Sequence, residues 1–178
     1  MPSPVERPAQ APARSIGVGD ALPMLRLTDH AGAVVETASL RGRWVVLFFF
    51  PKDFTPGCTA QACAMRDGYE EFARLGAVVI GVSSDTPERH RTFASWLGLP
   101  FHLISDAGGQ LRRELGVPRT LWVIPGRVTY VVDPSGVVRH VFNSQMRFGA
   151  HVRQALETIR AGAGGAGGAG GTRVDGGS

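Results

Sequence analysis

Cysteine is scarce in this sequence of 178 residues, which carries only Cys58 and Cys63. Two thiols are too few for a disulfide-dense secreted scaffold or for a zinc site built from four thiolates. The remaining composition, with 43% hydrophobic residues, is typical of one compact domain with a buried core. The role of the two cysteines therefore depends on where they lie in the chain.

Long hydrophobic runs are also missing. The longest, from Trp44 to Phe50, is far shorter than the roughly 20 residues that a membrane helix needs. The first residues, MPSPVERPAQAPARS, hold prolines and charges where a secretory signal would hold an apolar stretch. We therefore expect no contact with a membrane and a cytoplasmic location.

Lysine is nearly absent, since Lys52 is the only one among the 19 basic residues. The formal net charge of +4 thus rests on arginines, which are scattered and form no run of five or six. Such a distribution is typical of a solvated surface rather than of a nucleic-acid-binding face. We expect no nucleic-acid partner.

Both ends of the chain differ in composition from its middle. Residues 1–17 are rich in proline and alanine and show no apolar periodicity, which predicts a disordered arm. Residues 161–178, AGAGGAGGAGGTRVDGGS, predict a flexible tail, because so many glycines cannot repay the entropy of ordering. The predicted domain spans residues 18–160.

Strand patterns alternate with helix patterns between these ends. Two short strands around TDHAG predict an N-terminal hairpin, and the run from Trp44 to Phe50 is typical of a central strand buried on both faces. Thr86, Pro87 and Gly98 predict the N-cap, first residue and stop of a helix. Further strands are expected at 77–82, 101–104, 128–132 and 137–142, and further helices at 58–74, 107–115 and 149–160. This order predicts an α/β fold with a mixed central sheet and helices on both faces.

The segment PKDFTPGCTAQAC, from Pro51 to Cys63, follows the central strand and opens a helix. In open α/β sheets, functional sites lie at the carboxyl ends of the strands. Cys58 falls in the first helical turn, where unpaired backbone N–H groups and the positive end of the helix dipole favour a thiolate. Thr55, three residues earlier, is expected to place its hydroxyl beside the sulfur. The pattern indicates a reactive cysteine.

A structural role is the alternative for each cysteine, because free cysteines are often small buried apolar residues. The polar, glycine-bearing surroundings of Cys58 favour an exposed helix start instead. For Cys63, the spacing favours a redox partner over a packing residue. Residues five apart on an ideal helix have Cα atoms roughly 8.5 Å apart, whereas a disulfide needs less than about 7 Å. A bond between these two cysteines would therefore require local unwinding.

Pro51, Thr55 and Cys58, in the pattern P-x-x-x-T-x-x-C, match the active-site motif of peroxiredoxins. The longer segment PKDFTPGCTAQAC resembles the Q-type subfamily, also called bacterioferritin comigratory proteins. The resemblance extends from Val18 to Ile159 and includes GVSSDTPERHRTFA, FHLISD and IPGRVTYVVDPSGVVRHVFNSQ. The family has a thioredoxin-like fold, which agrees with the predicted order of elements.

The resemblance implies a thiol peroxidase that uses neither metal nor haem, and hence no cofactor. Cys58 matches the peroxidatic cysteine, Cys63 the resolving cysteine, Thr55 and Arg127 the activating partners, and Pro51 the residue that shields the pocket. It also implies hydroperoxide substrates, reduction by thioredoxin or a similar dithiol, and a monomer.

Two residues depart from common family patterns. Gln61 stands where many peroxiredoxins outside the subfamily have glutamate, so a glutamate link in the active-site network is not expected. Phe50 replaces a frequent tyrosine and removes one hydroxyl near the pocket wall.

Other chemistry-bearing residues have weaker patterns. The five histidines show neither H-x-H nor H-x-x-x-H spacing, so we expect surface or partly satisfied side chains and no metal site. Phe54 and Trp122 either cover the pocket or pack elsewhere. Two rival functions remain: a general thiol–disulfide oxidoreductase, although the CxxxxC spacing differs from its usual CxxC, and a thiol-based redox sensor that passes its oxidation to a partner.

Overall fold

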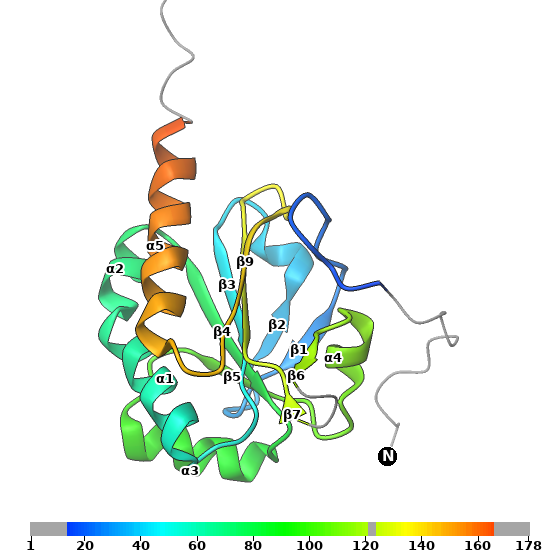
Figure 1. The fold of residues 1–178 in the computed structure, drawn as a ribbon, viewed down its shortest axis with the longest axis vertical. Helices are drawn as coiled ribbons and strands as arrows, with labels where there is room; N and C mark the ends of the chain where they lie inside the picture. The colour runs from blue at the N-terminus through cyan, green and yellow to red at the C-terminus, as the bar shows by residue number, and fades with distance from the viewer. Residues whose placement is uncertain (1–13, 121–123, 166–178) are drawn as a thin grey trace, which may run out of the picture.

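Five strands in the order β5-β4-β3-β8-β9 form the central sheet of the computed structural model, which describes residues 14–120 and 124–165 (Figure 1). β3 (Val45–Phe49), β4 (Val78–Ser83) and β5 (His102–Ser105) are parallel to one another. β8 (Val128–Val132) pairs antiparallel with both β3 and β9 (Val138–Asn143). The predicted mixed sheet is therefore confirmed.

β3 lies in the middle of this sheet and is buried along its whole length. Its side chains alternate between two hydrophobic clusters, as the pleat of a strand requires. Val46 and Phe48 belong to the cluster that also holds residues of four helices, namely α1 (Pro56–Asp67), α2 (Tyr69–Arg74), α3 (Pro87–Leu97) and α5 (Phe148–Gly165). Leu47 and Phe49 belong to the other, with residues of α4 (Gln110–Glu114) and the hairpin β1 (Arg26–Thr28) and β2 (Val34–Glu36). Helices cover both faces, as predicted.

The helix predicted from Thr86, Pro87 and Gly98 is confirmed. The Thr86 hydroxyl accepts a hydrogen bond from the backbone N–H of Arg89, and Gly98 ends the helix with a left-handed φ of 63°. The single helix predicted over 58–74 is instead divided at Gly68 into α1 and α2. A Cβ atom at Gly68 would lie 2.7 Å from Val152 of α5, so the glycine lets α5 approach this point closely.

Three small elements complete the fold. A short 3₁₀ helix, η1 (Thr37–Leu40), follows the N-terminal hairpin. β6 (Arg119–Thr120) and β7 (Ile124–Pro125) form a separate two-stranded antiparallel sheet that the sequence did not predict.

The described structure extends past both predicted domain boundaries, 18 and 160. At the N-terminal side, Ile16 donates its N–H to the carbonyl of Leu115 at 3.0 Å. At the C-terminal side, α5 continues to Gly165, because Gly162 has no side chain to collide with the Trp44 ring. The predictions of disorder for 1–13 and of flexibility for 166–178 lie outside the described residues.

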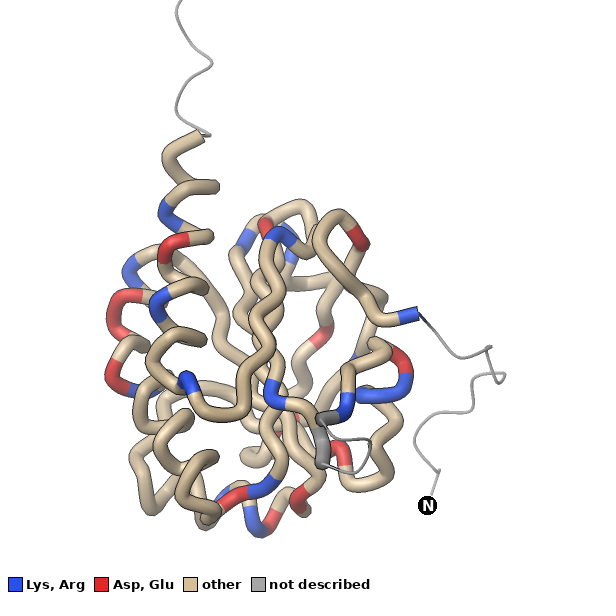
Figure 2. Tube along the Cα trace, viewed as in Figure 1, with Lys and Arg blue, Asp and Glu red and all other residues tan. Residues whose placement is uncertain are grey.

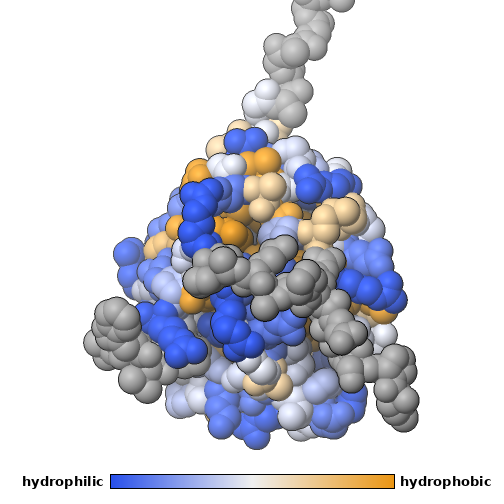
Figure 3. All heavy atoms as spheres, turned by 90° about the vertical axis from the view of Figure 1, so that its right-hand side faces the viewer, coloured by the Kyte–Doolittle hydropathy of each residue, from blue (hydrophilic) through white to orange (hydrophobic). Residues whose placement is uncertain are grey.

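Charges of both signs are interspersed over the described chain (Figure 2). On the face turned toward the viewer in Figure 3, hydrophilic side chains surround a smaller apolar area. Within residues 14–120 and 124–165, no helix is both long and apolar enough to span a bilayer.

A substitution at Gly81 of β4 tests how tightly the hydrophobic core is packed around Phe48. It pairs with Phe48 across β3 and β4, and a Cβ atom there would lie 2.7 Å from the Phe48 ring and 2.9 Å from Leu103. Gly81→Ala should therefore lower the free energy of unfolding by about 1–3 kcal/mol, measured by urea denaturation. Gly108→Ala is the control, because no atom lies within 4 Å of a Cβ there. Equal effects of the two substitutions would contradict this account.

Candidate active site

Cys58 lies at the carboxyl end of β3, in the first turn of α1. The strand ends at Phe49, a loop follows, and Thr55 is the extended N-cap residue before Pro56 begins the helix. Cys58 therefore belongs to the first helical turn, whose N–H groups have no carbonyl partner within the helix. The side chain is not exposed as predicted, since only 1% of Cys58 is accessible. The thiol is thus held in a fixed, nearly water-free environment.

Arg127 reaches this sulfur because of the register between β3 and β8. Val128 of β8 lies opposite Phe49, so the residue before it lies beside the start of the Cys58 loop. The guanidinium Nη2 donates to Cys58 Sγ at 3.4 Å, and Arg127 is only 4% exposed. The predicted proximity of Arg127 to Cys58 is confirmed.

Gln61 and Phe148 hold Arg127 in this orientation. Nη1 of Arg127 donates to Gln61 Oε1 at 2.5 Å, and the Phe148 ring lies 4.9 Å from the guanidinium carbon. Gln61, which stands where many peroxiredoxins have glutamate, is therefore still linked to Arg127, through a neutral amide oxygen. No motif in the sequence points to Phe148, which joins the site from the first turn of α5.

Thr55 and Pro51 lie in the loop, and their hydrogen bonds go to groups other than the sulfur. The Thr55 hydroxyl donates to the carbonyl of Lys52 at 3.0 Å, so its single proton is not directed at Cys58. The half-buried Pro51 offers its carbonyl to the Ser84 hydroxyl at 3.3 Å. The predicted bond from Thr55 to sulfur is therefore absent from this reduced form, because the closer backbone carbonyl takes the proton.

Cys63 is a free, half-buried thiol on the same helix as Cys58. α1 is continuous from Pro56 to Asp67, so the two residues have the separation of an ideal helix, about 8.5 Å between Cα atoms. That separation is too large for a disulfide. The described structure is the reduced, fully wound form of the site.

Comparison with known proteins identifies the family. Residues 18–141 match the model of the AhpC/TSA family. Peroxiredoxin Q from Populus jackii, named as chloroplastic, is 43% identical over 147 residues, which cover 82% of this chain and 69% of the relative. The chloroplastic peroxiredoxin Q of Sedum lineare is 44% identical over 144 residues, which cover 80% and 77%.

Solved structures of peroxiredoxins also resemble this chain. The peroxidoxin BcpB of Mycobacterium tuberculosis superimposes with a TM-score of 0.73 at 36% identity, covering 81% of this chain and 96% of that one. The bacterioferritin comigratory protein of Xanthomonas campestris gives 0.73 at 28% identity, covering 81% and 99%.

The chain belongs to the AhpC/TSA family, as a Q-type peroxiredoxin. Its fold is thioredoxin-like, and it is a peroxidase of this class. Cys58 is the residue around which the contacts described above are organised.

Arg112 is a component of this peroxiredoxin site that the sequence did not reveal. From α4 on the opposite side of β3, it donates to the carbonyl of Phe50 at 2.8 Å and to that of Gly126 at 3.0 Å. Its burial lowers the pKa of the guanidinium. The two carbonyls belong to the residues that follow β3 and precede Arg127. Arg112 therefore ties together the two segments that bring Cys58 and Arg127 into contact.

The histidines also differ from the prediction. His90 and His151 are fully buried rather than on the surface. His151 contacts the Thr129 hydroxyl and the Ser144 carbonyl, and His90 lies in a polar network beside the Cys58 loop. In the part of the chain that is described, no group of three His, Cys, Asp or Glu residues is arranged to hold a metal ion.

The sequence left open whether Phe54 and Trp122 cover the pocket or pack elsewhere, and the structure bears on Phe54 alone. Phe54 packs on Phe93 and Trp96 of α3, with ring centroids 5.1 and 5.7 Å away, which favours the packing role. Trp122 lies outside the described residues.

Arg127 offers a direct test of the site. Arg127→Lys keeps the charge but cannot donate to Gln61 and Cys58 from one rigid fork. We expect its rate constant for peroxide reduction to fall on the order of 100-fold, the typical effect of losing one preorganised donor, and that of Arg127→Ala to fall further. Single-turnover rates in a Cys63→Ser background provide the measurement.

The control is Arg139→Lys, at an arginine that pairs with Asp133 in the hairpin of β8 and β9. Its rate should match the parent. If Arg127→Ala also reacted at the parental rate, the contact with Cys58 would have no catalytic role.

Proposed function

We propose that this peroxiredoxin reduces hydrogen peroxide and alkyl hydroperoxides with Cys58, resolves the product with Cys63 and is recycled by thioredoxin or a similar dithiol. The observation that carries the proposal is the buried contact between Arg127 Nη2 and Cys58 Sγ at a helix N-terminus. The structure of the related Xanthomonas campestris protein is described for its alkyl peroxide reduction activity, which supports this substrate class.

In the first step, the Cys58 thiolate attacks one oxygen of the peroxide. An S–O bond forms, the O–O bond breaks, and the leaving oxygen takes a proton to become water or an alcohol. The sulfur loses two electrons and becomes a sulfenic acid. Arg127 already donates to the sulfur, so its guanidinium is placed to stabilise the negative charge that develops on the oxygens.

In the second step, the Cys63 thiol attacks the sulfenic sulfur. The S–O bond breaks, a disulfide forms, and the oxygen leaves as water with the proton of the Cys63 thiol. Because α1 is continuous between the two residues, its first turns must unwind beforehand. An external dithiol then supplies two electrons and two protons, becomes a disulfide itself and restores both thiols.

Burial favours this function over general thiol–disulfide exchange. Cys58 is 1% exposed, so a protein disulfide cannot reach its sulfur in the wound form, whereas a small hydroperoxide needs only a minor opening. Nothing in the site favours a redox sensor over turnover, and steady consumption of peroxide with a reductant distinguishes the two.

The location and assembly of the protein belong to the proposal as well. The plant relatives are named as chloroplastic, whereas we keep the cytoplasm as the predicted location of this chain. We also keep the monomer, which sedimentation of the reduced and oxidised protein tests.

Cys58→Ser tests the identity of the nucleophile. A serine hydroxyl does not reduce peroxides, so we expect turnover to be abolished in an assay of peroxide-dependent NADPH oxidation coupled through thioredoxin and its reductase. Cys63→Ser should still consume one equivalent of peroxide in a single turnover. Residual steady turnover by Cys58→Ser above a few per cent would assign the nucleophile elsewhere.

Oxidation should link Cys58 to Cys63 within one chain. After treatment with one equivalent of peroxide, mass spectrometry of peptides should show this disulfide in monomeric protein, and amide exchange over residues 58–67 should accelerate because the helix has unwound. A covalent dimer as the main product would contradict an intramolecular resolving step.

A further inference from the structure

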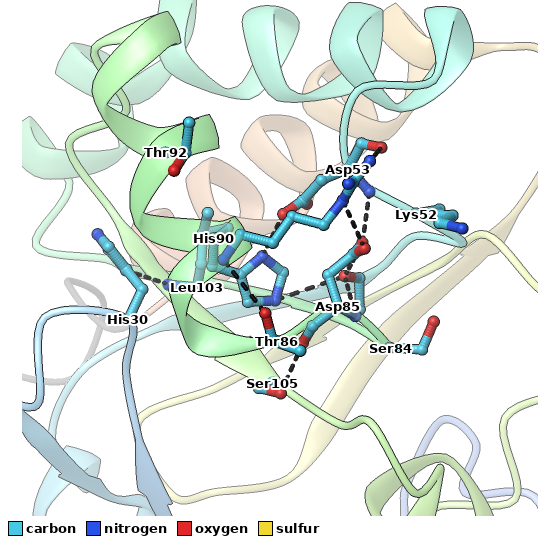
Figure 4. A network of polar contacts seen from close by, with 12 residues as sticks. His30, Lys52, Asp53, Ser84, Asp85, Thr86, His90, Thr92, Leu103 and Ser105 are labelled. Carbon is cyan, nitrogen blue, oxygen red and sulfur yellow. Dashed lines mark hydrogen bonds and ion pairs between the residues drawn. The ribbon is translucent and has the colours of Figure 1, made fainter.

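A buried polar network lies beside the Cys58 loop and takes no part in the chemistry above (Figure 4). Its centre is Asp53, which is 0% exposed and lies five residues before Cys58. Asp53 is held at three atoms. Its N–H donates to Asp85 Oδ2 at 2.6 Å, its Oδ2 lies 2.6 Å from His90 Nδ1, and its carbonyl accepts from Arg89 at 3.4 Å. All three partners lie between the end of β4 and the first turns of α3.

The partners of His90 fix the number of protons in this network. His90 Nε2 lies 3.2 Å from the carbonyl oxygen of Ile104, which can only accept, and 3.4 Å from the Ser83 hydroxyl. Because that hydroxyl gives its one proton to Asp85 Oδ2, neither partner donates to Nε2, and Nε2 itself carries a hydrogen. One further proton then lies between Nδ1 and Asp53 Oδ2, whichever of the two holds it. Without it, a ring lone pair would face a carboxylate at 2.6 Å in a site closed to water. Burial raises the pKa of Asp53, which agrees with a proton kept at this position.

The residue after Asp53 shows why such a tie is needed. Phe54 has a φ of 62°, in the left-handed region that side chains other than glycine rarely adopt. This turn redirects the chain toward Thr55 and the start of α1. An unfavourable backbone conformation persists only where its surroundings hold it. Here the ties on Asp53 hold one side, and the packing of the Phe54 ring on α3 holds the other.

We propose that Asp53 and His90 are positioning residues of the peroxide reaction: the proton that they share clamps the strained loop to α3 and so fixes Cys58 against Arg127. Neither residue touches the sulfur or the peroxide. The proposal rests on Cys58 as the peroxide-reacting thiol. It also assigns the unwinding of α1 a starting point, because the chain before Phe54 stays anchored while the turns after it open.

His90→Phe removes both nitrogens while it keeps a ring in the same space. We expect its peroxide rate constant to fall about 10-fold or more, since small misplacements of reacting groups have effects of this size. Amide exchange over residues 53–58 should accelerate in the reduced protein. Asp53→Asn is the conservative variant, because its amide can donate to Nδ1 while Nε2 still donates to Ile104. The peroxide rate constant of Asp53→Asn should therefore stay much closer to that of the parent than the rate constant of His90→Phe does.

A second histidine–aspartate pair supplies the matched control. His102 Nδ1 lies 2.8 Å from Asp29 Oδ2, the same two atoms as in the Asp53 pair, but Asp29 belongs to the N-terminal hairpin. His102→Phe should leave both the peroxide rate and the exchange over 53–58 at parental values. An equal loss in both variants, or a folded His90→Phe that reacts within about twofold of the parent, would overturn the proposal.

Two measurements keep the proposal testable if His90→Phe does not fold. NMR of the parent should show a proton on His90 Nε2, by its coupling to nitrogen-15, and a strongly deshielded proton between Nδ1 and Asp53 Oδ2. An unprotonated Nε2 would overturn the proposal. Ser83→Ala, which removes a hydroxyl shared by Asp85 and His90, should give a smaller loss of rate in the same direction, and an unchanged rate would count against the clamp. The NMR result does not depend on activity, so a failure of Cys58 as nucleophile would be recognised separately.

Discussion

The antiparallel pairing of β8 with β3 is the constraint on which the site depends. Cys58 and Arg127 are 69 positions apart in sequence, yet the register that sets Val128 opposite Phe49 brings them into contact. Arg112 reinforces this register, because it donates to the carbonyl of Phe50, just after β3, and to that of Gly126, just before Arg127. A shift by one residue would turn the side chains of β8 to the other face and separate the pair.

Burial gives the arginine its chemical significance. A guanidinium removed from water requires partners for its charge. In the described structure, Arg127 contacts a neutral amide at Gln61, the aromatic face of Phe148 and the sulfur of Cys58. Of these three groups, only the sulfur can become an anion. Gln61 therefore accepts a hydrogen bond from the guanidinium without bringing a negative charge to it.

The proposed mechanism places two opposing requirements on α1. Attack on peroxide needs a wound first turn that fixes Cys58, whereas the disulfide needs that turn open. The contacts are distributed accordingly. Asp53 and Phe54, before the helix, are held by contacts with α3 and with Asp85, which precedes α3. The hydroxyl of Thr55 is bonded only to the neighbouring loop backbone. In the proposed mechanism, the site can thus return to one starting geometry after each cycle.

The sequence alone determined the alternating elements, the mixed sheet, the helix from Pro87 and the position of Cys58 at a strand-to-helix turn, because each follows from local periodicity and capping. The family motif also pointed to Arg127 and Cys63. Only the tertiary structure decided that Cys58 is buried, that the Thr55 proton turns to Lys52, and that Arg112, Phe148 and His90 belong around the site. These residues come from α4, α5 and α3, and no local pattern records which side chains meet when separate elements pack on one sheet. The end of α5 was missed for the same reason, since a glycine-rich segment continues as a helix where Gly162 lies against Trp44.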